Sequence, residues 1–311
     1  MLLTRFILAL STLILLSLGA CTQTESKGAL QAGQRMKIVT TTSILKDAVQ
    51  NIVGDAADVE SIMGSGVDPH LYKATQGDLQ KLTNADVVVY NGLHLEGKMG
   101  EVLEKLSRQK TVVAGAESIP DTKLKRSPQF QDSHDPHVWF DVTLWKEVVK
   151  HLSDEFQKKD PANAEVYQKN TAAYLQQLDE LHQWVMQEIA SVPEPQRILI
   201  TAHDAFGYFG DAYNIQVRGL QGISTVSEFG LQDVASLVNY ISDNKIKAVF
   251  VESSVSPKAI EAVVIGSKKK GHDVKIGGTL FSDALGEYGT PEGTYAGMVR
   301  HNVNTIVSSL K

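Results

Sequence analysis

The sequence predicts an α/β fold of two lobes, each with a mainly parallel sheet flanked by helices. Short apolar runs alternate with amphipathic stretches from residue 37 onward, and the same alternation restarts at residue 197. Strands that are apolar almost throughout are typical of parallel sheets covered on both faces. The two series are separated by one long helical stretch, so we expect a single backbone helix to join the lobes across a cleft.

The N-terminal α/β lobe is expected at residues 36–160. Its first strand, Lys37-Ile-Val-Thr-Thr41, is rich in β-branched residues, which favour strands. An amphipathic segment follows each strand, as in βαβ units. We expect strands at 37–41, 59–63, 86–90 and 111–114, and helices at 44–53, 76–82 and 99–106.

The C-terminal α/β lobe is expected at residues 193–311 and repeats the pattern. Its first strand, Arg197-Ile-Leu-Ile-Thr-Ala202, again precedes alternating apolar and amphipathic segments. We expect strands at 197–202, 215–218, 248–252 and 273–276, and helices at 231–241, 257–267 and 294–310.

The connecting helix is expected at residues 161–192. Asp160 is a suitable N-cap and Pro161 suits a first turn, while Pro193 and Pro195 lie beyond its end. Some 30 helical residues would span about 45 Å, enough to run along the back of both lobes. Its expected buried stripe is Tyr167, Tyr174, Leu178, Leu181, Val185 and Ile189.

Residues 1–20 have the pattern of a lipoprotein signal peptide. Arg5 precedes an apolar run that ends in Leu18-Gly-Ala-Cys21, which resembles a bacterial lipobox. We expect lipidation at Cys21 and a flexible polar tether over 21–35; an uncleaved membrane anchor is the alternative. Either interpretation places the protein outside the cytoplasm, in a periplasm or on a cell surface.

The composition limits the chemistry available to the chain. Of 311 residues, 42% are hydrophobic and 21% charged, as in folded soluble proteins, and the net charge of −6 gives no general attraction to nucleic acid. The single cysteine excludes an intramolecular disulfide or a cysteine-based metal cluster, whereas nine histidines remain. Any metal site must therefore use His, Asp and Glu.

Two Asp-Pro-His tripeptides form an internal repeat. They are Asp68-Pro-His70 and Asp135-Pro-His137, and the first follows an expected strand. Proline restricts its own backbone and that of the residue before it, so each histidine follows a rigid turn. Two surface turns that happen to contain histidine are the alternative to a pair of metal ligands.

Two further candidates follow expected strands in the second lobe. His203 ends the first strand, with Asp204 beside it either to cap the next helix or to orient an imidazole. Asp283 follows the last strand, where a helix cap is the simpler role. Ligands in open α/β sheets bind at the carboxyl ends of strands, so all four side chains are expected at the interlobe cleft.

Three imidazoles and one carboxylate suit a divalent transition metal ion. Zn²⁺ accepts this set tetrahedrally, while Mn²⁺ favours oxygen and higher coordination. Glu252 is a further acidic residue at a strand end and is expected to support a ligand histidine. Trp139, Trp145 and Trp184 are expected in the core or at interfaces.

At this point the chain resembles the cluster A-I (TroA-like) solute-binding lipoproteins of bacterial zinc and manganese ABC transporters. The resemblance covers essentially the whole mature chain and includes Asp135-Pro-His-Val-Trp-Phe-Asp141, His203-Asp-Ala-Phe-Gly-Tyr-Phe209 and Leu280-Phe-Ser-Asp-Ala284. It implies metal ligands at His70, His137, His203 and Asp283. It also implies a monomer that delivers Zn²⁺ or Mn²⁺ to an ABC permease and its ATPase subunit.

The resemblance does not identify which metal ion the chain binds. Manganese- and iron-selective members of that family often carry Glu where this chain has His203, and many zinc members have a His-rich loop before the second ligand. Here residues 121–132 contain no histidine. The chain departs from both subtypes.

The sequence is compatible with two other functions. Three histidines and a water around zinc form a catalytic arrangement, so a secreted zinc metallohydrolase with Glu252 as base is the alternative to a binding protein. The discriminating residue is Asp283, because a fourth protein ligand would close the open position. An additional adhesin role is the third hypothesis for a surface lipoprotein. We expect no enzyme, no catalytic residue and no nucleic-acid partner.

Overall fold

The computed structural model describes residues 34–126 and 133–311, and Arg35–Lys311 forms one compact unit. The expected signal peptide, the lipidation at Cys21 and most of the tether lie outside the described residues. Within these residues, no helix is both long and apolar enough to cross a membrane.

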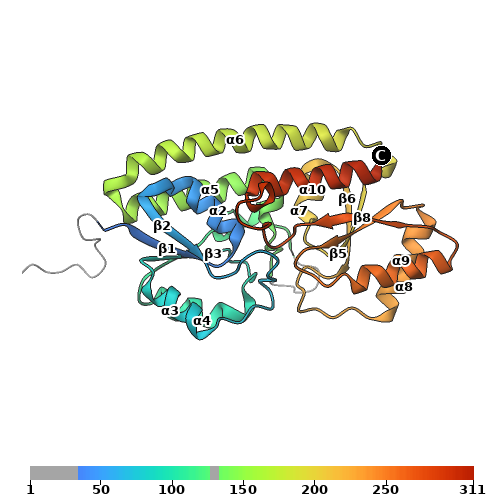
Figure 1. Ribbon diagram of the computed structural model, residues 1–311, viewed down its shortest axis with the longest axis horizontal. Helices are drawn as coiled ribbons and strands as arrows, with labels where there is room; N and C mark the ends of the chain where they lie inside the picture. The colour runs from blue at the N-terminus through green and yellow to red at the C-terminus, as the bar shows by residue number, and fades with distance from the viewer. Residues whose placement is uncertain (1–33, 127–132) are drawn as a thin grey trace, which may run out of the picture. The chain divides into compact units, whose positions relative to one another are not determined.

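The N-terminal lobe contains a four-stranded parallel sheet in the order β2-β1-β3-β4. α2 and α5 lie on one face of the sheet, and α3 and α4 lie on the other (Figure 1). Val39, Val88, Leu82 and Leu103 are buried between the sheet and α3 and α4. The elements are β1 (Met36–Thr40), α2 (Ser43–Val53), β2 (Ala57–Ser61), α3 (Gln76–Asn84), β3 (Val87–Tyr90), α4 (Gly100–Ser107), β4 (Thr111–Ala114) and α5 (Val142–Lys159).

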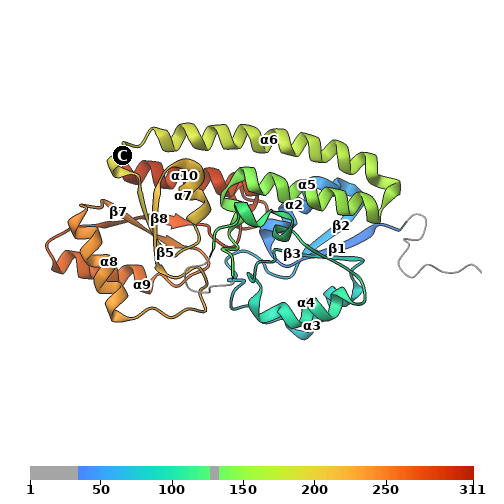
Figure 2. The same ribbon diagram turned by 180° about the vertical axis from the view of Figure 1, so that it is seen from behind.

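The C-terminal lobe contains two parallel strand pairs, β5-β6 and β7-β8, with β5 lying beside β7. α8 and α9 cover one face, and α7 and α10 cover the other, as both ribbon views show (Figures 1 and 2). Ile200, Val249, Ile241 and Ile260 form part of its core. The elements are β5 (Ile198–His203), α7 (Gly207–Tyr213), β6 (Gln216–Gln221), α8 (Leu231–Asp243), β7 (Ala248–Glu252), α9 (Lys258–Lys269), β8 (Lys275–Leu280) and α10 (Tyr295–Leu310).

One long helix, α6 (Ala164–Ala190), packs against α2 and α5 of the first lobe and α7 and α10 of the second. It runs along both lobes in Figure 1. The predicted fold of two α/β lobes on one backbone helix is confirmed. So is the predicted stripe, since Tyr167, Tyr174, Leu178, Leu181, Val185 and Ile189 are all buried.

The start of this helix differs from the prediction. A short 3-10 turn, η6 (Pro161–Asn163), precedes α6, and the Asp160 side chain caps neither element. Instead, Asp160 Oδ2 accepts hydrogen bonds from the Tyr167 hydroxyl at 2.7 Å and from Asn163 Nδ2 at 2.8 Å. Its partners are therefore the side chains of the first helical turns.

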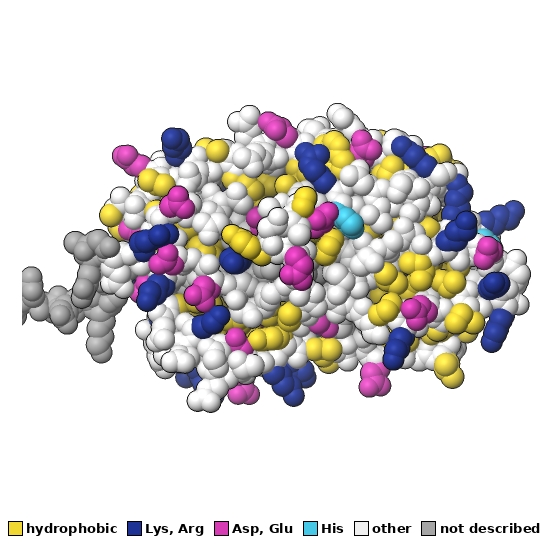
Figure 3. Space-filling model, in the orientation of Figure 1, with side chains coloured by type: hydrophobic (Ala, Val, Ile, Leu, Met, Phe, Trp, Pro, Cys, Tyr) yellow, Lys and Arg dark blue, Asp and Glu magenta, His cyan; other side chains and the backbone are white. Residues whose placement is uncertain are grey.

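The helix α5 was not expected from the sequence. Its N-cap is Asp141, whose carboxylate accepts from the Thr143 N–H at 2.8 Å, and its buried face is apolar. Because α5 packs against α6, the connection between the lobes runs as a helical hairpin. On the face seen in Figure 3, acidic and basic side chains are interspersed over both lobes.

Candidate metal centre

Four side chains meet between the lobes, at the carboxyl ends of the strands. A ligand atom from each of His70, His137, His203 and Asp283 lies within 4.8 Å of the others, and all four side chains are buried. His70 lies in the loop after β2, and His137 precedes the 3-10 turn η5 (Val138–Phe140). His203 is the last residue of β5, and Asp283 follows β8. The structure thus brings together all four residues predicted as ligands.

The polar atoms of this cluster face one another. Asp283 Oδ1 lies 3.4 Å from His137 Nε2, and Asp283 Oδ2 lies 3.4 Å from His203 Nε2 and 3.9 Å from His70 Nε2. None of these five atoms has a hydrogen-bond partner within the described residues, although all are buried. Burying unpaired polar atoms is costly, so their convergence on one point fits a cation between them.

The two Asp-Pro-His turns place their histidines by the same device. Asp68 Oδ1 accepts a hydrogen bond from the backbone N–H of His70 at 2.8 Å, and Asp135 Oδ1 accepts from that of His137 at 3.0 Å. Each aspartate thereby closes a turn over the proline and fixes the backbone of the histidine.

Asp135 also orients the ring of His137. Its Oδ1 accepts a hydrogen bond from His137 Nδ1 at 2.7 Å, which leaves Nε2 pointing at Asp283. The Tyr208 hydroxyl donates to the backbone oxygen of Asp135 at 2.9 Å and accepts from the Lys125 N–H at 3.0 Å. This role of Asp135 was not predicted, although its position two residues before a predicted ligand was a usable signal.

Glu252 performs the corresponding role for His203. Its Oε2 lies 2.5 Å from His203 Nδ1, and its Oε1 accepts from the backbone N–H of His203 at 2.8 Å. This contact joins the ends of the neighbouring strands β5 and β7. The structure therefore places Glu252 where the sequence suggested, against the ring nitrogen that faces away from the other ligands.

Asp204 has neither of the two roles considered for it from the sequence. The N-cap of α7 is Phe206, without a side-chain cap bond, so the capping role considered for Asp204 is wrong. The ring partners of His137 and His203 are Asp135 and Glu252 instead. Burial and the nearby charge of Asp135 raise the pKa of Asp204.

Another buried carboxylate, that of Glu96, organises the loop beside the cluster. Glu96 Oε1 accepts from the Thr41 hydroxyl at 2.6 Å and from the Asn91 N–H at 2.7 Å. Asn91 Nδ2 in turn donates to the backbone oxygen of Pro136 at 3.1 Å, next to His137. Glu96 is thus a structural support for the second histidine turn, at some distance from the ligand atoms.

Charges within the cluster set its protonation. Burial lowers the pKa of His70 to about 3, so this ring is neutral at pH 7. Burial acts in the same direction on His137, but Asp135 and Asp283 outweigh it and raise its pKa to about 9. Burial also opposes the charge on His203, yet Glu252 and Asp283 hold the pKa of that ring well above its ordinary value.

The neighbouring histidines favour the ionised form of Asp283. Burial alone would raise its pKa, but the adjacent His203 and His137 hold that pKa well below the usual range. The neighbouring carboxylates thus favour a proton on His137 and on His203, whereas burial disfavours one on His70. A divalent cation entering the cluster would replace the protons of His137 and His203.

A cavity of about 260 Å³ adjoins the cluster at His70, with apolar walls that include Leu93, Ile223 and Val226 from the two lobes. His94 and His134 line this cavity and lie outside the group of four. His134 Nε2 contacts Asp121 Oδ1 at 2.8 Å. These two histidines therefore line the same cavity as His70.

Two α/β lobes on one backbone helix, with a buried cluster of three histidines and an aspartate between them, define a class of two-lobed binding proteins. A family model described as the zinc-uptake complex component A, periplasmic, matches residues 38–309. The chain belongs to this family.

Similar proteins cover nearly the whole chain. It is 53% identical to a manganese-binding lipoprotein, MntA, of Bacillus subtilis, over 93% of this chain and 94% of that protein. It is 47% identical to the zinc-binding protein TroA of Treponema pallidum, over 92% of each chain. The solved structure of that periplasmic protein superposes with a TM-score of 0.87 at 47% identity, covering 89% of this chain and 99% of the other.

Proposed function

We propose that this chain is the extracytoplasmic metal-binding component of an ABC importer, which captures Zn²⁺ or Mn²⁺ and delivers it to a membrane permease. The observation that carries the proposal is the convergence of three Nε2 atoms and both Asp283 oxygens on one buried point, without other partners in the described part of the chain. The names of the similar proteins, manganese-binding MntA and zinc-binding TroA, support it.

The ligands in this proposal are His70, His137, His203 and Asp283. Four protein ligands complete a tetrahedral shell, which suits capture and delivery. Both oxygens of Asp283 face the cluster, so a bidentate carboxylate would provide the fifth contact that Mn²⁺ favours. Asp135 and Glu252 hold two of the imidazoles in orientation and raise their basicity.

The working units in this proposal are the lobes at 36–160 and 193–311 and the connecting segment at 161–192. The ligands are buried and come from both lobes, so the described conformation is a closed one. Metal entry and release then require the lobes to part. A lipid on Cys21 and the tether at 21–35 would keep the protein beside its permease.

Energy for transport would come from a partner. The sequence has no Walker A motif, so ATP hydrolysis falls to a separate ATPase subunit. We propose that the protein acts as a monomer, because both halves of the metal site come from one chain.

A hydrolase is the weaker proposal. A catalytic zinc needs an open coordination position, and both Asp283 oxygens lie where the fourth ligand would be. Glu252, the candidate base, is already paired with His203 through both of its oxygens.

Metal accumulation in cells tests the proposed function. Cells lacking this protein should take up less of one metal, and comparing zinc with manganese identifies the cargo. Zinc in the purified protein would not decide this, because nitrogen-rich sites bind Zn²⁺ more tightly than Mn²⁺ whatever the biological task. Unchanged uptake of both metals would contradict the proposal.

A further inference from the structure

Asp283 follows the last strand of the C-terminal lobe, yet its closest backbone anchors come from the N-terminal lobe. We propose that Trp139 and Ser43 hold Asp283 together with His70 and His137, so that His203 is the ligand that leaves when the lobes part. This inference rests on the proposed metal-binding function and adds the order in which the ligands act.

Two hydrogen bonds bracket Asp283. Trp139 Nε1 donates to the backbone oxygen of Ser282 at 3.0 Å, on the peptide directly before Asp283. Ser43 Oγ accepts from the backbone N–H of Leu285 at 2.9 Å, two residues after it. Ser43 begins α2, and Trp139 lies in η5, two residues after His137. Both anchors therefore belong to the lobe that carries the first two histidines.

The loop between β8 and α10 is also bonded to the N-terminal lobe at its far end, where Tyr295 begins α10. The Tyr295 N–H donates to Asp47 Oδ2 at 3.2 Å, and the Tyr295 hydroxyl donates to the backbone oxygen of Trp139 at 2.6 Å. The Tyr295 ring stacks on Trp145, with centroids 5.5 Å apart. Tyr295 is fully buried, so both ends of the segment from Ser282 to Tyr295 are held against α2, α5 and η5.

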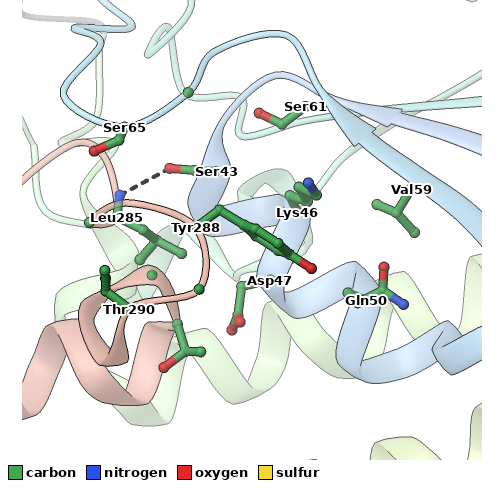
Figure 4. A pocket seen from close by; sticks show the side chains of 15 residues that line it. Ser43, Lys46, Asp47, Gln50, Val59, Ser61, Ser65, Leu285, Tyr288 and Thr290 are labelled. Carbon is green, nitrogen blue, oxygen red and sulfur yellow. Dashed lines mark hydrogen bonds between the residues drawn. The ribbon is translucent and has the colours of Figure 1, made fainter.

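Figure 4 shows this junction at a cavity of about 680 Å³ between α2 and the loop. The bond from Leu285 to Ser43 crosses it, while the exposed ring of Tyr288 lies over Lys46, 5.2 Å from its amine. The loop therefore contacts the N-terminal lobe on both sides of this cavity.

Just before Asp283, the chain is held by hydrogen bonds within the C-terminal lobe. Ser282 Oγ lies 2.9 Å from Ser254 Oγ, and the Asn302 side chain bonds both backbone groups of Phe281. From Asp283 to Tyr295, the hydrogen bonds described above go to the other lobe. The Ser282–Asp283 peptide thus lies where the hydrogen bonds of the loop change from the C-terminal lobe to the N-terminal lobe.

His203 is held quite differently. It ends β5, and its ring and backbone both bind Glu252 of β7, inside the C-terminal lobe. Several hydrogen bonds join the lobes across the cleft: the Thr225 hydroxyl donates to Asp68 Oδ2 at 2.6 Å, and Tyr208 of α7 bonds Lys125 and Asp135 of the N-terminal lobe. Opening the cleft would break these bonds and carry His203 away, leaving His70, His137 and Asp283 in place.

A double-mutant cycle with Zn²⁺ as the probe tests whether Asp283 moves with His70 and His137 or with His203. Thr225→Val removes one of the hydrogen bonds that join the lobes and should weaken Zn²⁺ binding by about tenfold, the usual effect of losing a hydrogen bond to a charged group. In a His203→Ala background, the remaining ligands His70, His137 and Asp283 are all held by the N-terminal lobe. Thr225→Val should then change the affinity by less than twofold. Thr225→Ser keeps the hydroxyl and should restore wild-type binding.

Asp283→Ala is the matched background. It leaves His70 and His137 on one lobe and His203 on the other, so binding still requires closure, and Thr225→Val should again cost about tenfold. If Thr225→Val reduced Zn²⁺ affinity equally in the His203→Ala and Asp283→Ala backgrounds, the inference would be overturned. Absence of Zn²⁺ binding by the wild-type chain would instead overturn the proposed function.

The anchors are tested on the same cycle. In the His203→Ala background, Ser43→Ala should make binding sensitive to Thr225→Val again, and Ser43→Thr, which keeps the acceptor, should not. Ser254→Ala removes the contact to the other lobe and serves as the control that leaves the cycle unchanged. If Ser254→Ala had the effect expected of Ser43→Ala, Asp283 would move with the C-terminal lobe, against the inference.

Discussion

Glu252 contacts His203 through both carboxylate oxygens. Oε2 lies 2.5 Å from the ring Nδ1, and Oε1 accepts a hydrogen bond from the backbone nitrogen at 2.8 Å. Glu252→Gln keeps the shape but removes the charge that makes the imidazole basic. We predict that Zn²⁺ affinity falls by about 10–100-fold. Competition with a chelator of known affinity measures it. Glu261→Gln, on the exposed face of α9, is the control and should bind as wild type.

Metal binding should release protons and strengthen as pH rises. The pKa of His137 is raised to about 9 and that of His203 lies well above its ordinary value, whereas His70 is neutral at pH 7. Below those raised values each bound proton must leave before the metal binds. Affinity should therefore fall as pH falls, by roughly tenfold per pH unit for each proton displaced.

Calorimetry in buffers of different ionisation enthalpy counts these protons directly. We expect between one and two protons per Zn²⁺ at pH 7. A binding constant that stayed flat between pH 6 and 8 would show that the two rings are already neutral in the metal-free protein.

Metal should stabilise the fold. Five buried polar atoms without hydrogen-bond partners in the described residues gain a common ligand when the ion binds. At a free concentration 100 times the dissociation constant, binding adds about 2.7 kcal/mol to the free energy of unfolding. Thermal unfolding with Zn²⁺ and with a chelator should then differ by roughly 5–10 °C. The His137→Ala protein should lose most of this difference; retaining it would place the bound metal elsewhere.

Gly219 is predicted to be essential for the position of His203. A Cβ at Gly219 would lie 2.4 Å from the backbone nitrogen of Asp204 and 2.7 Å from the carbonyl carbon of His203. Gly219→Ala should destabilise the protein by about 1–3 kcal/mol and weaken Zn²⁺ binding, because β6 must move away from β5. Gly100→Ala, where no other atom lies within 4 Å, is the control. Normal Zn²⁺ affinity in Gly219→Ala would show that the strand shift does not reach His203.

The sequence predicted most of the fold because apolar strands and amphipathic helices alternate regularly. It missed α5, although Val142, Trp145, Val149, Leu152 and Phe156 repeat at helical spacing and are all buried. The last strand was predicted to end at residue 276, before two glycines, but β8 continues to Leu280. A Cβ at Gly277 would lie 2.8 Å from Phe250 and from Ser309, so glycine here allows α10 to pack closely on the strand.

The site was predictable to the extent that its signals are local. Each Asp-Pro-His turn is contained in three residues, so both histidines could be placed from the sequence. The bonds from Trp139 to Ser282 and from Thr225 to Asp68 join residues 143 and 157 positions apart. No local pattern encodes such pairs, since they arise only when the lobes pack together.

We infer that one metal ion binds between His70, His137, His203 and Asp283. Titration of the metal-free protein with Co²⁺, followed by visible absorption, tests it most directly. We expect one ion per chain with a tetrahedral spectrum, and a much weaker, altered spectrum after alanine substitution of any one of the four residues. A wild-type spectrum and affinity in Asp283→Ala or His137→Ala would contradict it.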